Sequence, residues 1–180
     1  MAVINTITTG IFGSSFATDG TGALNVQQNG VTLGVYGNIP AFHASSNNTA
    51  QAVSASTWTK VALNVELYDT NNNFDPTTNY RFTPTVAGYY QINGSLYLNY
   101  TGSAGTRVGV AIYKNGSTYT EHQLTNAGGS LYGTMTTSSI IYLNGTTDYV
   151  ELYGWYNSAT SQFYGVSVYT WLNGVLVKAV

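Results

Sequence analysis

The chain contains two histidines, His43 and His122, and histidine is the side chain best suited to acid–base chemistry near neutral pH. A catalytic imidazole needs a nucleophile to activate and a carboxylate that fixes its orientation. The two histidines fall in separate expected strands, and neither lies close to a Gly-x-Ser-x-Gly motif or to a pair of carboxylates. We therefore interpret both as structural or surface histidines and predict no catalytic residue.

A second candidate for chemistry is the oxygen-rich segment 69–75, with the sequence Asp-Thr-Asn-Asn-Asn-Phe-Asp. Its oxygen-bearing side chains alternate as they do in a calcium-binding loop. Phe74, however, stands where such a loop requires glycine, and Tyr80 stands where it requires the bidentate glutamate. The chain also has no cysteine, which excludes thiolate metal ligands, disulfides and a cysteine nucleophile. The sequence thus predicts neither a metal site nor a cofactor.

Polar and aromatic side chains offer binding surface instead of reactive groups. Only 7% of the residues are charged, whereas 43% are hydrophobic and 14% aromatic, including 16 tyrosines. Some tyrosines must fill a core, and exposed ones would suit stacking against sugars. Asn-x-Ser/Thr triplets are expected by chance in a chain so rich in these residues; they begin at Asn47, Asn93, Asn99, Asn115 and Asn144. This composition favours a structural or binding module over an enzyme.

The charge and hydropathy patterns exclude two classes of partner. The formal net charge is -2 with five Lys and Arg in total, so the chain lacks the basic surface that nucleic-acid binding requires. No apolar run approaches the roughly 18 residues of a membrane-spanning helix. Residues 1–9 lack the basic start and continuous apolar stretch of a signal peptide. We expect no nucleic-acid partner, no membrane insertion and no cleaved secretory signal.

The periodicity of the chain predicts strands and no helix. Residues 58–68 alternate apolar and polar side chains, which is typical of a strand with one buried face, whereas residues 69–78 read as a polar loop. Asn115-Gly116 suits a tight turn with positive φ between two strands, and Asn144-Gly145 is expected to act in the same way. The strands expected from these patterns are 40–44, 58–68, 80–82, 89–100, 107–114, 117–123, 138–143, 148–157 and 166–177.

The first part of the chain differs from the rest. Residues 1–37 contain short apolar pieces at 3–7, 22–26 and 31–36, separated by Gly, Ser and Thr. Such pieces can pair as strands but cannot enclose a core. We therefore divide the chain into an extended N-terminal attachment arm, residues 1–37, and an all-β domain, residues 38–180. A disordered terminus is the alternative interpretation of the arm.

Several sequence pieces resemble the globular head of complement C1q in order and spacing across residues 39–180. They are Ile39-Pro40-Ala41-Phe42, the stretch from Asn64 to Phe82 with Asp75-Pro76 and Tyr80-Arg81-Phe82-Thr83, then Pro84 with Ala87-Gly88-Tyr89-Tyr90, Val110 to Gly116, and Thr170 to Leu176. The resemblance implies the C1q/TNF-like jelly roll, a sandwich of about ten antiparallel strands shared with tumour necrosis factor and assembled as a trimer. The collagen-like stalk and the cysteines of complement are missing. Residues 20–26 and 30–32 look instead like segments that precede such heads in bacteriophage virion proteins.

The segment 89–100 carries the candidate trimer interface. One face holds a normal sandwich core, formed by Tyr90, Ile92, Gly94, Leu96 and Leu98. The opposite face combines tyrosines with uncharged hydrogen-bonding groups, namely Tyr89, Gln91, Asn93, Ser95, Tyr97 and Asn99. Rings and amides of this kind supply interface area without the desolvation cost of ions. The resemblance places this strand, and the strand with Leu172, in the sheet that faces the threefold axis. The alternative is an ordinary solvated face.

These observations predict a non-enzymatic, homotrimeric virion protein of a bacterial virus, made in the host cytoplasm. The favoured role is capsid decoration or cement, or a head fibre, with residues 1–37 attached to another virion protein. The first alternative is the receptor-binding tip of a tail fibre that recognises a host surface glycan or protein. The second is a secreted C1q-like binding module, which the missing signal peptide and cysteines disfavour.

Overall fold

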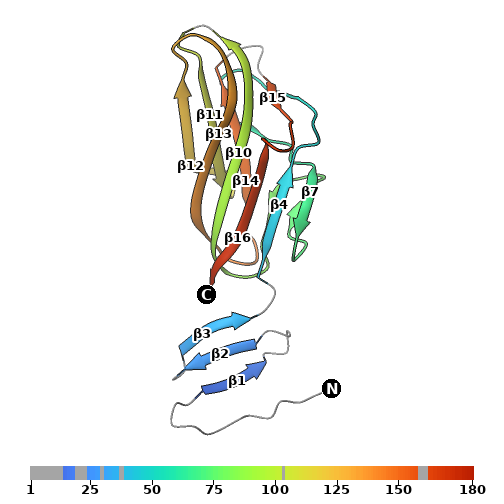
Figure 1. Ribbon diagram of the computed structural model, residues 1–180, viewed down its shortest axis with the longest axis vertical. Coiled ribbons are helices and arrows are strands. Elements are labelled where there is room, and N and C mark those ends of the chain that lie inside the picture. The colour runs from blue at the N-terminus through green and yellow to red at the C-terminus, as the bar shows by residue number, and fades with distance from the viewer. Residues whose placement is uncertain (1–13, 19–23, 29–30, 37–38, 103, 158–161) are drawn as a thin grey trace. The chain divides into compact units, whose positions relative to one another are not determined.

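The computed structural model describes residues 14–18, 24–28, 31–36, 39–102, 104–157 and 162–180, and these residues contain strands, turns and loops but no helix (Figure 1). Backbone contacts divide the chain into two units, Met1–Ile39 and Pro40–Val180. The boundary expected from the sequence falls two residues earlier, between residues 37 and 38.

The N-terminal unit holds a small antiparallel sheet of three strands, β1 (Ser14–Thr18), β2 (Leu24–Gln28) and β3 (Val31–Tyr36). The sequence predicted two of these strands but described the segment as extended. In the structure the strands pair with one another instead, with Gln28 directly opposite Val31. This pairing satisfies the backbone groups that face one another between β1 and β2 and between β2 and β3. The apolar piece at residues 3–7 lies outside the described residues.

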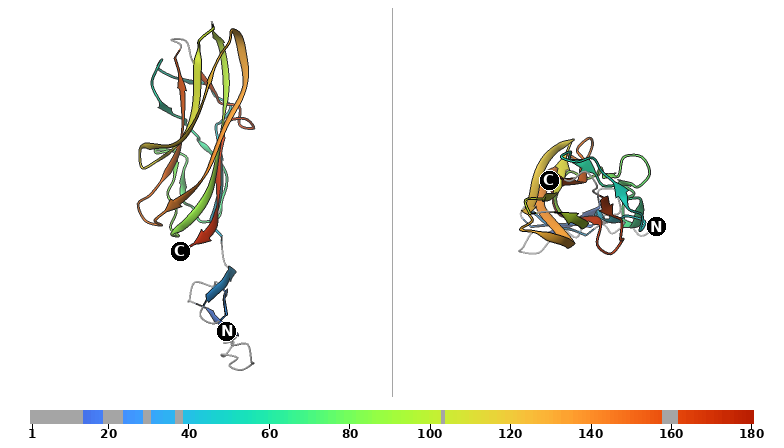
Figure 2. Two further views of the ribbon diagram at one scale, coloured as in Figure 1. Left: turned by 90° about the vertical axis from the view of Figure 1, so that its left-hand side faces the viewer. Right: turned by 90° about the horizontal axis from the view of Figure 1, so that it is seen from above.

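The second unit is a sandwich of two antiparallel sheets (Figures 1 and 2). The seven-stranded sheet contains β4 (Ala41–Ser45), β5 (Gln51–Ala52), β7 (Val65–Asp69), β10 (Gly88–Gly102), β13 (Gly129–Leu143), β15 (Gln162–Tyr164) and β16 (Trp171–Ala179). The six-stranded sheet contains β6 (Thr59–Lys60), β8 (Phe74–Asp75), β9 (Arg81–Phe82), β11 (Arg107–Lys114), β12 (Ser117–Thr125) and β14 (Val150–Tyr156). In the first sheet neighbouring strands follow the order β5-β15-β10-β16-β4-β7. β15 and β16 pair with successive parts of one edge of β10, and β13 pairs along its other edge.

The hydrophobic core lies between the two sheets and confirms the predicted inward face of β10. Tyr90, Ile92, Leu96 and Leu98 are fully buried, and Gly94 between them is buried as well. They pack in one cluster with residues of the opposite sheet, which include Val110, Ile112, Val150 and Leu152. The all-β sandwich predicted from the period-two pattern is therefore confirmed.

The segment 58–68 is not the single strand that the alternation predicted. Its first half forms β6, which pairs with β14, and its second half forms β7, which pairs with β4 in the other sheet. Val61 and Leu63 are buried in the core, but Val65 and Leu67 are exposed. The chain crosses between sheets at residues 61–64, so apolar side chains after the crossing no longer face the core.

Three other segments also differ from their predicted structures. β13 begins at Gly129, well before the expected strand 138–143, because its residues pair along the whole length of β10. The polar stretch 69–78 includes the short strand β8, which pairs with β9. Residues 166–170 form a turn held by hydrogen bonds from the backbone N–H of Tyr169 and Thr170 to the carbonyl of Val166, and β16 starts only at Trp171.

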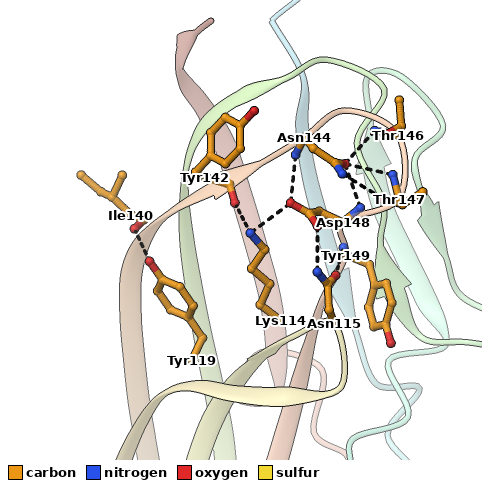
Figure 3. A network of polar contacts seen from close by, with 10 residues as sticks. All are labelled: Lys114, Asn115, Tyr119, Ile140, Tyr142, Asn144, Thr146, Thr147, Asp148 and Tyr149. Carbon is orange, nitrogen blue, oxygen red and sulfur yellow. Dashed lines mark hydrogen bonds and ion pairs between the residues drawn. The ribbon is translucent and has the colours of Figure 1, made fainter.

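The connections at Asn115-Gly116 and Asn144-Gly145 differ from each other. Asn115 and Gly116 both have positive φ, at 52° and 78°, and join β11 to β12 as predicted. Asn144 instead starts a longer loop, because its side-chain oxygen accepts hydrogen bonds from the backbone N–H groups of residues 146, 147 and 148. Asp148 links the two connections (Figure 3). It accepts a hydrogen bond from the Asn115 side-chain amide at 2.7 Å and forms an ion pair with Lys114 at 3.0 Å.

Replacing Gly116 with Val is expected to lower the free energy of unfolding by about 1–2 kcal/mol, because a β-branched residue fits poorly at positive φ. Urea unfolding followed by circular dichroism measures the change. Gly133→Val is the matched control: a Cβ at Gly133 meets no atom within 4 Å, and no positive φ is present there. Equal stability of Gly116→Val and the parent protein would show that this turn tolerates the side chain.

Candidate functional site

The outward side of the seven-stranded sheet brings together residues from three long strands. We call this surface the β10 face, and its residues are Tyr89, Gln91, Asn93, Ser95 and Tyr97 of β10, Thr136, Ser138, Ile140 and Tyr142 of β13, and Asn173 and Val175 of β16. The register fixes the grouping, since Gln91 is opposite Ile140 on one side and opposite Val175 on the other. Directly opposite residues of an antiparallel pair point to the same side of a sheet.

One end of the β10 face is an exposed apolar cluster. Tyr89 is 44% exposed, Tyr142 40%, Ile140 53% and Val175 41%. The rings of Tyr89 and Tyr142 contact each other with centroids 5.6 Å apart. A group of large apolar side chains that share one side of a sheet and remain in water is typical of an interaction surface.

The centre of the β10 face is a chain of side-chain amides. Gln91 Nε2 donates to Asn93 Oδ1 at 3.0 Å, and Asn93 Nδ2 donates to Asn173 Oδ1 at 3.0 Å. All three side chains are half-buried in the isolated chain. Because the amides already satisfy part of one another's hydrogen-bonding needs, covering them with another protein would cost little free energy.

The other end of the β10 face is aromatic, and its rings pack against one another. The Tyr97 ring packs against Tyr169 and Tyr164, with centroid distances of 5.2 and 5.8 Å. Ser95 Oγ donates to the carbonyl of Tyr169 at 2.7 Å, and Ser95 is already buried within the subunit. Rings held in place in this way lose little conformational entropy when they enter an interface.

Charge is almost absent from the strands that build the β10 face. β10 and β13 contain no Asp, Glu, Lys or Arg, and β16 contains one charged residue, Lys178. Lys178 lies opposite Tyr89 at the border of the face. Charged side chains keep a surface solvated, so a large sheet face without them is easily desolvated.

The structure corrects the assignment of Leu172 to the interface. Leu172 is fully buried and belongs to the hydrophobic core, because β16 alternates and its outward residues are Asn173 and Val175. Nothing is described for the side chain of Asn99. Sequence reasoning missed Ile140 and Tyr142, although their alternation with Ile141 and Leu143 was a signal that could have placed them on the outward face.

The two histidines lie on different sheets and are not brought together. His43 is on β4, where its ring contacts Trp171 and Tyr68 with centroid distances of 5.6 and 6.0 Å, and burial lowers the pKa of His43 below its usual value. His122 is an exposed residue of β12, and its Nδ1 lies 3.3 Å from the carbonyl oxygen of Thr136. Neither has a carboxylate or nucleophile among these contacts.

The carboxylates of the segment 69–75 are engaged by their own loop. Asp69 accepts hydrogen bonds from the backbone N–H groups of Asn71 at 3.0 Å, Phe74 at 2.6 Å and Asn73. The described part of the chain contains no group of three or more His, Asp or Glu side chains that could hold a metal ion. These carboxylates therefore stabilise a turn.

Acid is expected to weaken the fold through Asp75. Hydrogen bonds from the backbone N–H groups of Thr78 and Thr77 hold the pKa of Asp75 far below its usual value. A carboxylate whose pKa is depressed by folding stabilises the native state above the unfolded pKa of about 4, and this contribution disappears as the pH falls further. Asp75→Asn should therefore show a shallower loss of Tm than the parent protein between about pH 5 and pH 2. Parallel slopes would contradict this role.

Comparison with solved structures supports the fold. Eiger TNF from S. frugiperda aligns with a TM-score of 0.61 at 10% identity over 80% of this chain and 96% of that one. Murine APRIL at pH 8.5 aligns with a TM-score of 0.54 at 13% identity over 77% of this chain and 99% of that one. The chain has the TNF-like jelly-roll fold, as the C1q resemblance implied.

Other comparisons add no family. No protein-family model and no curated protein matches the chain. Within the described residues, no helix is long and apolar enough to cross a membrane.

Proposed function

We propose that this chain is a non-enzymatic protein that assembles as a homotrimer through the β10 face. The observation that carries the proposal is the combination of exposed rings, paired amides and missing charge on one side of a sheet. Tyr89, Ile140, Tyr142 and Val175 together leave a large apolar surface in water in the isolated chain, and burying it in a subunit contact would stabilise the assembly.

The expected number of subunits comes from the fold. The TNF-like jelly roll and the sequence pieces shared with the C1q head both favour three subunits around an axis, with this sheet turned toward it. In a cyclic trimer each contact joins one patch of a subunit to a different patch of its neighbour. The β10 face therefore need not be self-complementary.

We place the trimer on the virion of a bacterial virus, as a capsid decoration or cement protein or a head fibre. The support is the likeness of residues 20–26 to segments that precede such heads in virion proteins, together with the small size of the sheet β1–β3. A single sheet with three strands of five or six residues cannot enclose a core by itself, so it needs another layer to pack against. Residues 1–37 would therefore attach the trimer to another virion protein.

A receptor-binding tip of a tail fibre is the second candidate. The observation that favours it is an open cavity lined by Trp171 and His43, together with the exposed Val168. A site of this kind could recognise a glycan or protein of the host surface.

Light scattering coupled to size-exclusion chromatography tests the assembly, and we expect three times the 19.3 kDa of one chain. Immunogold electron microscopy of phage particles tests the location, with label expected on the head. A stable monomer would contradict the proposed interface. Label confined to the tail tip would favour the second candidate.

A further inference from the structure

A cavity of about 590 Å³ lies outside the β10 face, at the opposite edge of the same sheet. This volume lies within the range of about 300–1,000 Å³ typical of small-molecule sites. The cavity lies over β4, β7 and the start of β16, and its lining residues are His43, Ser45, Ser46, Asn47, Asn48, Val65, Leu67, Ser167, Val168 and Trp171. It is open to solvent, so a ligand could enter it, and the buried hydroxyls of Ser45 and Ser46 would reach that ligand by rotation about χ1.

Two buried hydroxyl groups in the lining have no hydrogen-bond partner. Ser45 is fully buried and Ser46 is 3% exposed, and the Oγ atoms of both are without a partner. Ser45 lies opposite Trp171 and Val65 in the register, on the outward side of the sheet where the cavity is. Ser46 also borders a smaller cavity of about 200 Å³. Buried polar groups are nearly always satisfied, so hydroxyls left without partners beside a cavity suggest that a ligand or a water held by it completes them.

The loop that follows these serines is held by hydrogen bonds and presents amide groups. Asn47 Oδ1 accepts a hydrogen bond from the backbone N–H of Thr49 at 3.2 Å, and Asn48 Oδ1 accepts one from the backbone N–H of Ser167 at 3.0 Å. Asn48 has a positive φ of 65°, a conformation that asparagine adopts more readily than most residues. With their oxygens engaged, both side chains have their NH₂ groups to offer as donors.

An aromatic wall completes the cavity, and no formal charge enters the lining. The Trp171 ring is partly exposed and is supported by His43 at a centroid distance of 5.6 Å. None of the lining residues is Asp, Glu, Lys or Arg. An ionic ligand would lose its hydration without gaining an ion pair. The lining suits a neutral molecule with an apolar face for the indole ring and hydroxyl groups for the serines and asparagines.

We propose that the cavity bounded by Trp171, His43, Ser45 and Asn48 is a binding site for a neutral saccharide. A pyranose ring has the required surface, since its C–H groups form an apolar face and its hydroxyls both donate and accept hydrogen bonds. The site is separate from the β10 face, although Trp171 lies opposite Ser95 at its border. The proposal therefore does not rest on the trimer or on a place in the virion.

The experiment is saturation-transfer NMR on the full-length protein with the methyl glycosides of glucose, galactose, mannose and N-acetylglucosamine. Methyl glucuronide, which differs from the glucoside by one carboxylate, is the charged control. We expect signal transfer to at least one neutral glycoside and none to the glucuronide. Light scattering on the same samples records the oligomeric state, so a failure of the trimer and a failure of sugar binding are distinguished.

Two variants then locate the site. Trp171→Ala should abolish the transfer, and Ser45→Ala should weaken binding by about tenfold. Because Ser45→Ala removes a buried hydroxyl without a partner, it should leave the Tm unchanged or higher, which separates a ligand role from a structural one. Ser117→Ala, at an exposed position of β12, is the matched control and should bind as the parent does.

Three results would overturn the proposal. One is the absence of transfer to every neutral glycoside, and another is transfer that survives in both cavity variants. The third is a trimer that binds no glycoside and separates into monomers on Trp171→Ala, which would make the cavity a contact for a second copy of the chain. If Trp171→Ala does not fold, the Ser45→Ala result decides alone.

Discussion

Replacing Tyr97 with Asp is expected to convert the proposed trimer into monomers. Tyr97 is half-buried in the isolated subunit and packs against Tyr164 and Tyr169 at the aromatic end of the β10 face. In the trimer the substitution would place one carboxylate per subunit beside tyrosine rings, because the one cation of β10, β13 and β16, Lys178, lies at the other end of the face. Each such buried charge costs several kcal/mol, so assembly should weaken by about 1,000-fold or more. Light scattering at low micromolar concentration measures the loss.

The control separates assembly from folding. Thr118→Asp introduces the same carboxylate at an exposed position of β12, in the other sheet, and should leave the trimer intact. Circular dichroism should show the β-sheet spectrum for both variants. A Tyr97→Asp protein that remains trimeric at the same concentration would show that the subunits meet through another surface.

The residues of the β10 face illustrate how far periodicity alone reaches. The outward set Tyr89, Gln91, Asn93, Ser95 and Tyr97 could be predicted because neighbours in a strand alternate, and burial of the residues between them confirms that alternation. A second local rule predicted the tight turn at Asn115-Gly116: few residues other than Asn and Gly adopt positive φ readily. Both predictions depend on local geometry.

The parts that could not be predicted depend on pairing between distant segments. Ile140 and Val175 join Gln91 only through registers that connect residues far apart in the chain, and no local pattern encodes those registers. The crossing at residues 61–64 was hidden for a related reason. The alternation of apolar residues is the same before and after the chain crosses from one sheet to the other. Val65 and Leu67 were therefore predicted to continue the buried face.

The cavity beside Trp171 depends mainly on pairing between distant segments, and only its chemical character could be read from the sequence. Its lining comes from four separate parts of the chain, which only the fold brings together: residues 43–48, Val65 and Leu67, the turn at 167–168, and Trp171. The sequence indicated sugar binding only in general terms, through its many tyrosines. The structure instead points to a tryptophan, two serines and two asparagines, because it shows which side chains share one hollow and which hydroxyls there are without partners.

Deleting residues 1–37 is expected to abolish incorporation into virions while leaving a folded trimer. The described strands of this segment pair only with one another, and Pro40–Val180 forms a compact unit with its own core. The short strands need further packing, and a neighbouring virion subunit would supply it by strand addition or by covering the sheet. The truncated protein should therefore keep the Tm of the jelly roll and the trimeric mass, but particles grown with it should carry none of it by immunoblot.

Adsorption of phage to host cells separates the two proposed virion roles, capsid decoration and receptor-binding tip. Free full-length trimer should fail to compete with phage for cells if it decorates the capsid, and should compete if it is a receptor-binding tip. We expect failure to compete, together with particles that lose infectivity faster on heating or at low ionic strength when the protein is absent. Gly133→Val, which leaves residues 1–37 unchanged, is the control and should be incorporated normally. If the truncated trimer still occupies virions at the level of the parent protein, residues 1–37 are not the attachment segment and the contact lies on the jelly roll itself.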